Sequence, residues 1–89
     1  MQIDATRKHA LTAIGNAVRT ARKARALSQE DLADVCSLDR TYVSGIERGA
    51  RNPTILSLWR IADALGVPLI QLIADAQEIA NAAKPVVRA

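Results

Sequence analysis

The stretch SLDRTYVSGIERGARNP, residues 37–53, combines two kinds of surface on one short helix. Asp39 is a typical N-cap residue and Gly49 a typical C-terminal stop, so a helix is predicted between them. Val43 and Ile46 lie three residues apart and indicate a face that is buried in a core. The positions left for the outward surface are Arg40, Thr41, Ser44, Gly45 and Arg48, with Tyr42 on the flank. An apolar back and a hydrogen-bonding front suit a helix that lies in a DNA groove.

A second helix is predicted immediately before this one. Ser28 and Asp31 have the spacing of a capping box at its start, and the helix ends near Cys36 or Ser37. Its apolar positions are Leu32, Ala33 and Val35. Only two or three residues then separate the two helices, which is the helix-turn-helix arrangement, and its second helix enters the major groove.

Three further helices are predicted from apolar residues that recur at spacings of three and four. The first lies within residues 5–25. The fourth begins after the cap Thr54 and ends at Gly66, and the fifth has Pro68 in its first turn. No strand-like alternation appears. The predicted fold class is therefore all-α, a five-helix bundle that contains a helix-turn-helix.

The chain has 89 residues, enough for one domain with a single modest core. We predict an N-terminal extension at residues 1–10, a helix-turn-helix domain with a dimerising fifth helix at 11–80, and a flexible tail at 81–89. The extension either lengthens the first helix or reaches along a DNA backbone.

The net charge of +3 is unevenly distributed. Residues 1–25 hold six basic residues and one acid, whereas acids outnumber bases in residues 28–65. A basic segment fits a polyanionic partner, and a solvated helix face explains it equally well. One cysteine without a signal-peptide pattern favours the bacterial cytoplasm, with the protein on the nucleoid when bound. No apolar run approaches the ~20 residues that cross a bilayer, so no membrane partner is expected.

His9 and Cys36 have no companions at metal-binding or catalytic spacing. We therefore expect no enzyme activity, no catalytic residue, no metal and no cofactor. His9 is expected to be exposed, Cys36 to be a small buried apolar group, and Trp59 to be partly buried.

The fifth helix is too apolar for a solvated helix. We expect one of its faces to pack on the fourth helix and the other to pair with a second copy. Such a homodimer would place two recognition helices about 34 Å apart on a palindrome. The predicted dimer interface consists of Leu69, Ile70, Leu72, Ile73 and Ala76.

Residues 27–67 resemble the phage-repressor-like (XRE-type) helix-turn-helix family, which has the lambda-repressor-like DNA-binding fold. Within that family, SQEDLA at 28–33 and LDRTYVSGIERGARNPTI at 38–55 are most similar to the controller proteins of bacterial restriction–modification systems. The resemblance implies a homodimeric transcription regulator that binds a palindromic operator in double-stranded DNA. A controller of this kind activates its own promoter at low occupancy and represses it at high occupancy.

The resemblance also implies roles for individual residues. Its base-reading positions are Arg40, Thr41 and Ser44. The positions that contact the DNA backbone are Gln29, Tyr42, Arg51 and Asn52, and Arg48 joins them because its charge suits phosphate. For Tyr42, packing against its own domain is an equal alternative. Arg22 and Glu47 match a structural ion pair. Glu30 and Asp34 match acids that touch the RNA polymerase sigma subunit in activating repressors, and plain solvated acids are the alternative.

One position departs from the family pattern, because Ser37 occupies the turn position that is usually Gly. A left-handed backbone there costs a non-Gly residue roughly 1 kcal/mol or more, which predicts a rearranged turn. Two alternative functions stay open. One is a phage- or plasmid-type repressor, and the other is a DNA-binding antitoxin whose main role is to bind a toxin protein.

Overall fold

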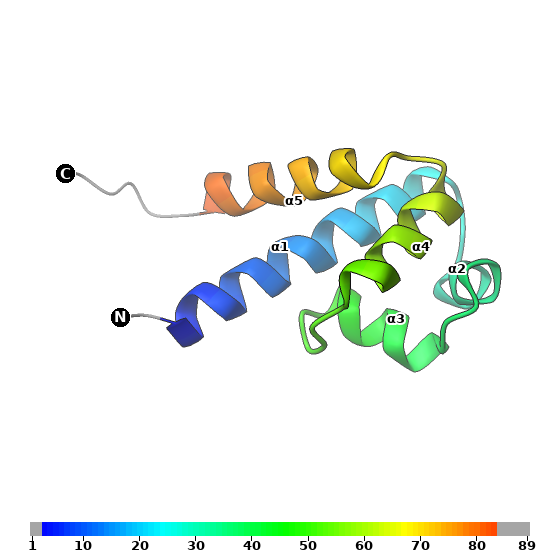
Figure 1. The fold of residues 1–89 in the computed structure, drawn as a ribbon, viewed down its shortest axis with the longest axis horizontal. Coiled ribbons are helices and arrows are strands. Elements are labelled where there is room, and N and C mark those ends of the chain that lie inside the picture. Colours follow the sequence, from blue (N-terminus) through cyan, green and yellow to red (C-terminus); the bar gives the residue numbers. More distant parts are fainter. Residues whose placement is uncertain (1–2, 84–89) are drawn as a thin grey trace.

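The computed structural model describes residues 3–83, with side chains from residue 5 onward, and this part of the chain contains five helices and no strand. The helices are α1 (Ile3–Ala24), α2 (Gln29–Cys36), α3 (Arg40–Glu47), α4 (Ile55–Leu65) and α5 (Leu69–Ala83). The predicted all-α class and the order of the helices are confirmed (Figure 1).

The core lies where α2, α3 and α4 meet the C-terminal half of α1, and α5 adds Leu72 and Ala76 to it. Its largest fully buried side chains come from α1, α2, α3 and α4 and are Val18, Leu32, Val43, Ile46, Ile61 and Leu65. The core therefore supports α2 and α3 from behind and leaves their opposite faces open.

α5 packs chiefly along α1, and not on α4 as expected, and Figure 1 shows the two helices side by side. Ala13 and Ala17 of α1 and Ala76 and Ala80 of α5 are all buried at this contact or next to it. Alanine allows two helix backbones to approach closely, which leucine does not. The alanines of both helices recur at spacings of three and four, so the sequence did contain a signal for this pairing.

The starts of α2, α4 and α5 follow local chemistry, and the start of α3 is an exception. Ser28 and Asp31 form the predicted capping box of α2, and the Thr54 side chain accepts a hydrogen bond from the Ser57 amide at the start of α4. Asp39 occupies the N-cap position of α3, but its side chain makes no capping hydrogen bond. The Pro68 carbonyl accepts the amides of Gln71 and Leu72, so Pro68 directly precedes the first turn of α5.

Three predictions about boundaries or burial can be compared with the structure. Residues 3–10 are continuous with α1, so within the described residues the extension lengthens the first helix. α5 continues to Ala83, three residues beyond the predicted domain end, and the rest of the predicted tail lies outside the described residues. Val35, which was predicted to be an apolar core position of α2, is 62% exposed. Cys36 is buried in its place, because Cys36 lies one turn after the buried Leu32.

Within residues 3–83 no single helix has both the length and the apolar character that crossing a bilayer requires. Only α4 and α5 taken together, with a bend of 104° between them, meet that test of length and composition.

Candidate nucleic-acid interface

The outward face of α3 gathers the predicted base-reading residues. Arg40, Thr41, Ser44 and Arg48 line one shallow hollow of about 140 Å³. Arg40, Thr41 and Arg48 are exposed and Ser44 is half-buried. The predicted grouping of these side chains is therefore present, and their role as base readers stays a prediction.

The opposite face of α3 is held firmly in the core. Val43 is 0% exposed and Ile46 is 1% exposed. Burial of two such side chains stabilises the helix position by about 1.5–3 kcal/mol each. The outward residues are thus displayed from a rigid support.

Tyr42 packs within its own domain, which is one of the two roles predicted for it, and its contact with DNA stays a prediction. Its hydroxyl lies 3.2 Å from the Ser57 Oγ, to which it donates, and 3.4 Å from the Thr54 amide nitrogen, from which it accepts. The Arg51 guanidinium lies over its ring, 5.0 Å from the centroid. Tyr42 therefore acts as a support that joins α3 to α4 and carries Arg51 by a cation–π contact. Ser57 completes this network and had no role in the sequence analysis.

Gly45 is buried under Arg51, although it was predicted to face outward beside the DNA. A Cβ at this position would overlap the Cγ of Arg51. The Gly45 carbonyl also accepts the amides of Ala50 and Arg51, at 2.8 and 3.2 Å. The glycine therefore gives the loop after α3 and the stem of Arg51 room to fold against the helix.

The predicted ion pair between Arg22 and Glu47 is present and buried. The Arg22 Nε donates to Glu47 Oε2 at 2.6 Å, and its Nη2 donates to Oε1 at 2.9 Å. The Arg22 Nη1 also donates to the Leu27 carbonyl at 2.8 Å. This two-point contact ties α1 to the C-terminal end of α3 and to the loop that precedes α2.

The charges of this pair are mutually stabilised. Burial by itself raises the pKa of Glu47, but hydrogen bonds from Arg22 and Gln29 and the charges of Arg22 and Arg19 outweigh it, so the pKa of Glu47 lies below its ordinary value. The hydrogen bond to Glu47 raises the pKa of Arg22. Both groups are therefore ionised at neutral pH.

Gln29 is the first residue of α2, and its side chain has a partner in the protein. Its Nε2 donates to Glu47 Oε1 at 3.0 Å. An amide nitrogen carries two hydrogens, so one remains for a phosphate oxygen. The predicted phosphate contact is thus still open to Gln29, with the side chain already oriented by Glu47.

The turn between α2 and α3 is not rearranged. Ser37 adopts the left-handed conformation, with φ 57° and ψ 41°, and ends α2 where a glycine usually would. Its amide is directed at the Ala33 and Asp34 carbonyls. The prediction of a rearranged turn was wrong, because the hydrogen bonds of this C-cap hold Ser37 in the left-handed conformation despite the strain of a non-Gly residue there.

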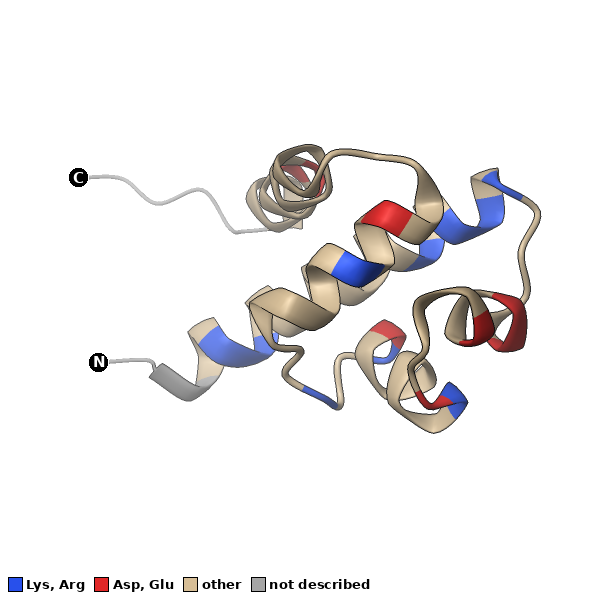
Figure 2. Ribbon diagram, turned by 45° about the vertical axis from the view of Figure 1, so that its right-hand side comes forward, with Lys and Arg blue, Asp and Glu red and all other residues tan. Residues whose placement is uncertain are grey.

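Two helices carry charges of opposite sign, as Figure 2 shows, with Lys and Arg along α1 and Asp and Glu on α2. Glu30 and Asp34 are exposed, and they lie four residues apart on α2. Hydrogen bonds within the capping box lower the pKa of Asp31, the third acid of this helix. The two predicted polymerase contacts are therefore accessible, and their role stays a prediction.

In the loop after α3, Arg51 and Asn52, two of the predicted DNA-backbone contacts, are exposed as well.

The structure divides the predicted dimer interface into two groups. Leu72 is 2% exposed and Ala76 is also buried, so both belong to the core of their own protomer. Leu69 is half-buried and packs against that core. Ile70 is 78% exposed and Ile73 is 43% exposed, and these two remain available to a second copy.

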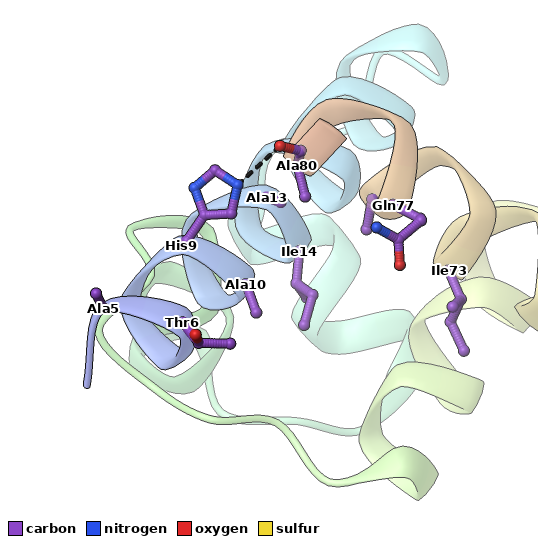
Figure 3. Close-up of a pocket in the computed structure, with 10 residues that line it drawn as sticks. Ala5, Thr6, His9, Ala10, Ala13, Ile14, Ile73, Gln77 and Ala80 are labelled. Carbon is purple, nitrogen blue, oxygen red and sulfur yellow. Dashed lines mark hydrogen bonds between the residues drawn. The ribbon is translucent and has the colours of Figure 1, made fainter. Parts of the chain in front are cut away.

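A groove of about 530 Å³ runs between α1 and α5 beside Ile73 (Figure 3). Its walls are mostly apolar, with Ala10, Ala13 and Ile14 on α1. His9 closes one end, where its Nε2 lies 2.7 Å from the Ala80 carbonyl oxygen and must donate to it. His9 was expected to be exposed and is half-buried instead, because α5 reaches the first turns of α1.

Cys36 and Trp59 can be compared with the burial that the sequence predicted for them. The Cys36 thiol is buried, donates to the Leu32 carbonyl at 2.9 Å, and has a pKa raised by burial. Its predicted role as a small buried group is confirmed. Trp59 is more than half exposed, less covered than expected. Among the described residues, no three His, Cys, Asp or Glu side chains are grouped to hold a metal ion.

The sequence of this chain matches a known protein family. The sequence model of the helix-turn-helix family matches residues 18–72. Control protein C.MunI from Mycoplasma sp is 42% identical over 65 residues, which cover 72% of this chain and 88% of that protein.

Two solved structures are similar as well. The restriction-modification controller protein C.AhdI from Aeromonas hydrophila is 42% identical, with a TM-score of 0.69 over 70% of this chain and 94% of that chain. The controller protein C.Esp1396I, a tetramer in complex with its natural 35 base-pair operator, is 36% identical, with a TM-score of 0.74 over 81% of this chain and 95% of that chain. The chain belongs to the phage-repressor-like (XRE-type) helix-turn-helix family of DNA-binding transcription regulators.

Proposed function

We propose that this protein is a sequence-specific transcription regulator that binds a palindromic operator as a homodimer and acts as the controller of a restriction–modification system. The observation that carries the proposal is that Arg40, Thr41 and Ser44 line one open hollow on a helix whose opposite face is fully buried. The protein acts on DNA in the bacterial cytoplasm.

Base recognition is assigned to the hollow on α3. Arg40 is the first residue of the helix, and its guanidinium can make two parallel hydrogen bonds to O6 and N7 of a guanine. Such a pair discriminates against a wrong base by about 1–3 kcal/mol. The Thr41 and Ser44 hydroxyls supply single hydrogen bonds, and the Thr41 methyl group can contact a thymine methyl.

Contacts to phosphate are assigned to both flanks of α3. Gln29 and the N-terminus of α2 lie on one flank, where unpaired backbone amides favour an anion. Arg48, Arg51 and Asn52 lie at the C-terminal end of α3 and in the loop that follows. Tyr42 takes part through Arg51, whose guanidinium it supports from below.

The second copy is proposed to pack against the exposed face of α5. Ile70 and Ile73 follow each other at a spacing of three, and Ile73 also forms part of the apolar groove. A two-fold axis at this face lets each copy bury the same patch and orients the two α3 helices for a palindrome. C.Esp1396I assembles as a tetramer on its operator, which supports association of this chain on DNA as well.

Contact with the RNA polymerase sigma subunit is proposed for Glu30 and Asp34. Both carboxylates are exposed on α2, at a spacing of four that places them on one face. This contact would provide the activating half of a controller's action.

The test is selection of bound duplexes from a random DNA library at two salt concentrations, with wild type and Arg40→Ala in parallel. We expect an inverted-repeat motif that Arg40→Ala relaxes at one defined base step in each half-site. Weak, motif-free binding with the same salt dependence in both proteins would contradict sequence-specific reading by α3. Such a result would favour a role in protein binding.

A further inference from the structure

We infer that a stripe of polar and basic residues on α1 contacts the DNA backbone beyond the region that the helix-turn-helix covers. The stripe, called the α1 stripe below, consists of Lys8, Thr12, Asn16, Arg19 and Lys23. The inference rests on the proposed function, since it needs DNA in front of α3. Lys8, Thr12 and Asn16 precede residues 18–72, which match the family, so the match does not cover these three positions.

The α1 stripe is one face of a continuous helix. At 100° per residue, its five positions fall within an arc of roughly 80°, and all five are exposed. With a rise of 1.5 Å per residue, Lys8 and Lys23 are about 22 Å apart along the helix axis. One strand of duplex DNA presents a phosphate about every 3.4 Å of axis, so a stripe of this length faces several phosphates.

The middle of the stripe lies at the C-terminal end of α3. A Cβ on Gly15 would lie 2.6 Å from the Glu47 carbonyl oxygen, which places the backbone of α1 directly against the end of α3. A Cβ on Gly49 would lie 3.3 Å from the Thr12 Cα, so the loop after α3 touches the same part of α1. The charge of Arg19 also acts on Glu47. The α1 stripe therefore borders the surface that carries Arg48 and Arg51.

The cations of the stripe form no ion pair within residues 5–83. Residues 5–24 contain no Asp or Glu. Within residues 5–83 the one ion pair joins Arg22 to Glu47, which leaves Lys8, Arg19 and Lys23 without an ion-pair partner in this described part of the chain. A row of three cations that form no ion pair in the described part of the chain, beside a DNA-facing helix, suits phosphate. The neutral members of the row can form hydrogen bonds with the same DNA backbone.

Arg7, the residue next to Lys8 on α1, provides the control. Arg7 is also exposed but lies 100° around the helix from Lys8, outside the stripe. Arg7→Gln and Lys8→Gln change the net charge and the helix propensity almost equally. Only the second removes a cation from the stripe, so a difference between them reports position and not total charge.

The experiment measures the affinity of wild type, Arg7→Gln, Lys8→Gln and the triple variant Lys8→Gln/Arg19→Gln/Lys23→Gln for the selected operator and for an unrelated duplex, over a series of KCl concentrations. We expect the slope of log K against log salt to become shallower by about 0.9 for each phosphate that a variant no longer neutralises, counted twice in a homodimer. The preference for operator over unrelated DNA should stay unchanged, because phosphates carry no sequence information.

Three outcomes separate the possibilities. A triple variant with the wild-type slope would overturn the inference, and so would an Arg7→Gln effect as large as that of Lys8→Gln. A wild type that shows no preference for any operator would contradict the proposed function itself. Circular dichroism of each variant checks that the helix content is retained.

Discussion

The two ends of α1 belong to regions that are built differently. Its C-terminal half is fixed to α3 by the buried Arg22–Glu47 pair and by the close contact at Gly15. Its N-terminal half lies against α5 through alanines and leaves an apolar groove beside Ile73 (Figure 3). Directional polar contacts hold the first region in one geometry, as base reading requires. Apolar contacts in the second region are non-directional, and they leave a surface that a second copy can complete.

The largest expected effect on stability comes from the C-terminal half of α1, where the Arg22–Glu47 pair is buried. Glu47→Ala leaves Arg22 as an unpaired buried charge, and such a change costs about 3–5 kcal/mol of the free energy of unfolding. Urea denaturation of the variant measures this cost. Glu78→Ala, which replaces an exposed acid on α5, is the control and should change stability by less than about 0.5 kcal/mol. A Glu47→Ala protein as stable as this control would mean that the pair does not fix α3.

The same pair predicts a decrease of stability in acid. The pKa of Glu47 is lowered in the folded protein, so its contribution is complete above its ordinary pKa of 4.5 and disappears as the pH falls through the folded value. Wild type should therefore lose more stability than Glu47→Gln when the pH drops below about 4.5. Urea midpoints of both proteins between neutral and acidic pH test this difference, and parallel curves would contradict it.

In the apolar region around α5, substitution of exposed residues should weaken association of two copies and leave the folding of each copy unchanged. Ile70→Ala combined with Ile73→Ala shortens four side chains in the symmetric dimer, and the loss of one buried CH2 group from each costs about 0.8 kcal/mol, or about 3 kcal/mol in total. The dimer dissociation constant should rise on the order of 100-fold, as measured by analytical ultracentrifugation. Val35→Ala removes an equally exposed apolar side chain from α2 and should leave the constant unchanged. Equal effects of the two changes would place the interface elsewhere.

The contact between α1 and α3 leaves no space for a larger residue at position 15. Gly15→Ala directs a methyl group at the carbonyl oxygens of Ile46 and Glu47, which are backbone atoms and cannot turn aside. We expect a net destabilisation of about 1–2 kcal/mol, because overpacking exceeds the gain of up to 1 kcal/mol in helix propensity. Thr20→Ala, at an exposed position of the same helix, should show the propensity gain alone. A Gly15→Ala protein that gains stability like Thr20→Ala would contradict the close contact.

The comparison also explains which features the sequence could predict. Caps such as Ser28 and Thr54 depend on residues three positions away, and the face formed by Arg40 and Ser44 follows from the helical repeat alone. These features are local, and the structure has them. The ion pair between Arg22 and Glu47 is not local, and it was available only through the family resemblance.

The features that were missed depend on tertiary contacts. The bond from His9 to Ala80 and the packing of α5 on α1 join residues far apart in the sequence, and the place of Gly45 under Arg51 depends on the conformation of the loop after α3. The alanine spacing in α1 and α5 was the one signal for the packing of α5 on α1. Tyr42 could not be assigned from sequence, because its hydroxyl partner Ser57 lies on the next helix.

The smallest expected effect is a gain, at the turn inside the rigid region. Ser37→Gly relieves a left-handed backbone that costs a non-Gly residue roughly 1 kcal/mol or more, and the added freedom of the unfolded chain offsets part of this gain. We expect a net increase of about 0.5–1 kcal/mol in the free energy of unfolding, measured with urea. Ala74→Gly, at an exposed position inside α5, is the matched control and should lose about 1 kcal/mol. If Ser37→Gly also lost stability, the serine would be stabilising the turn by an interaction stronger than the strain. The operator affinity of Ser37→Gly should equal that of wild type, because the turn already has the geometry that glycine prefers.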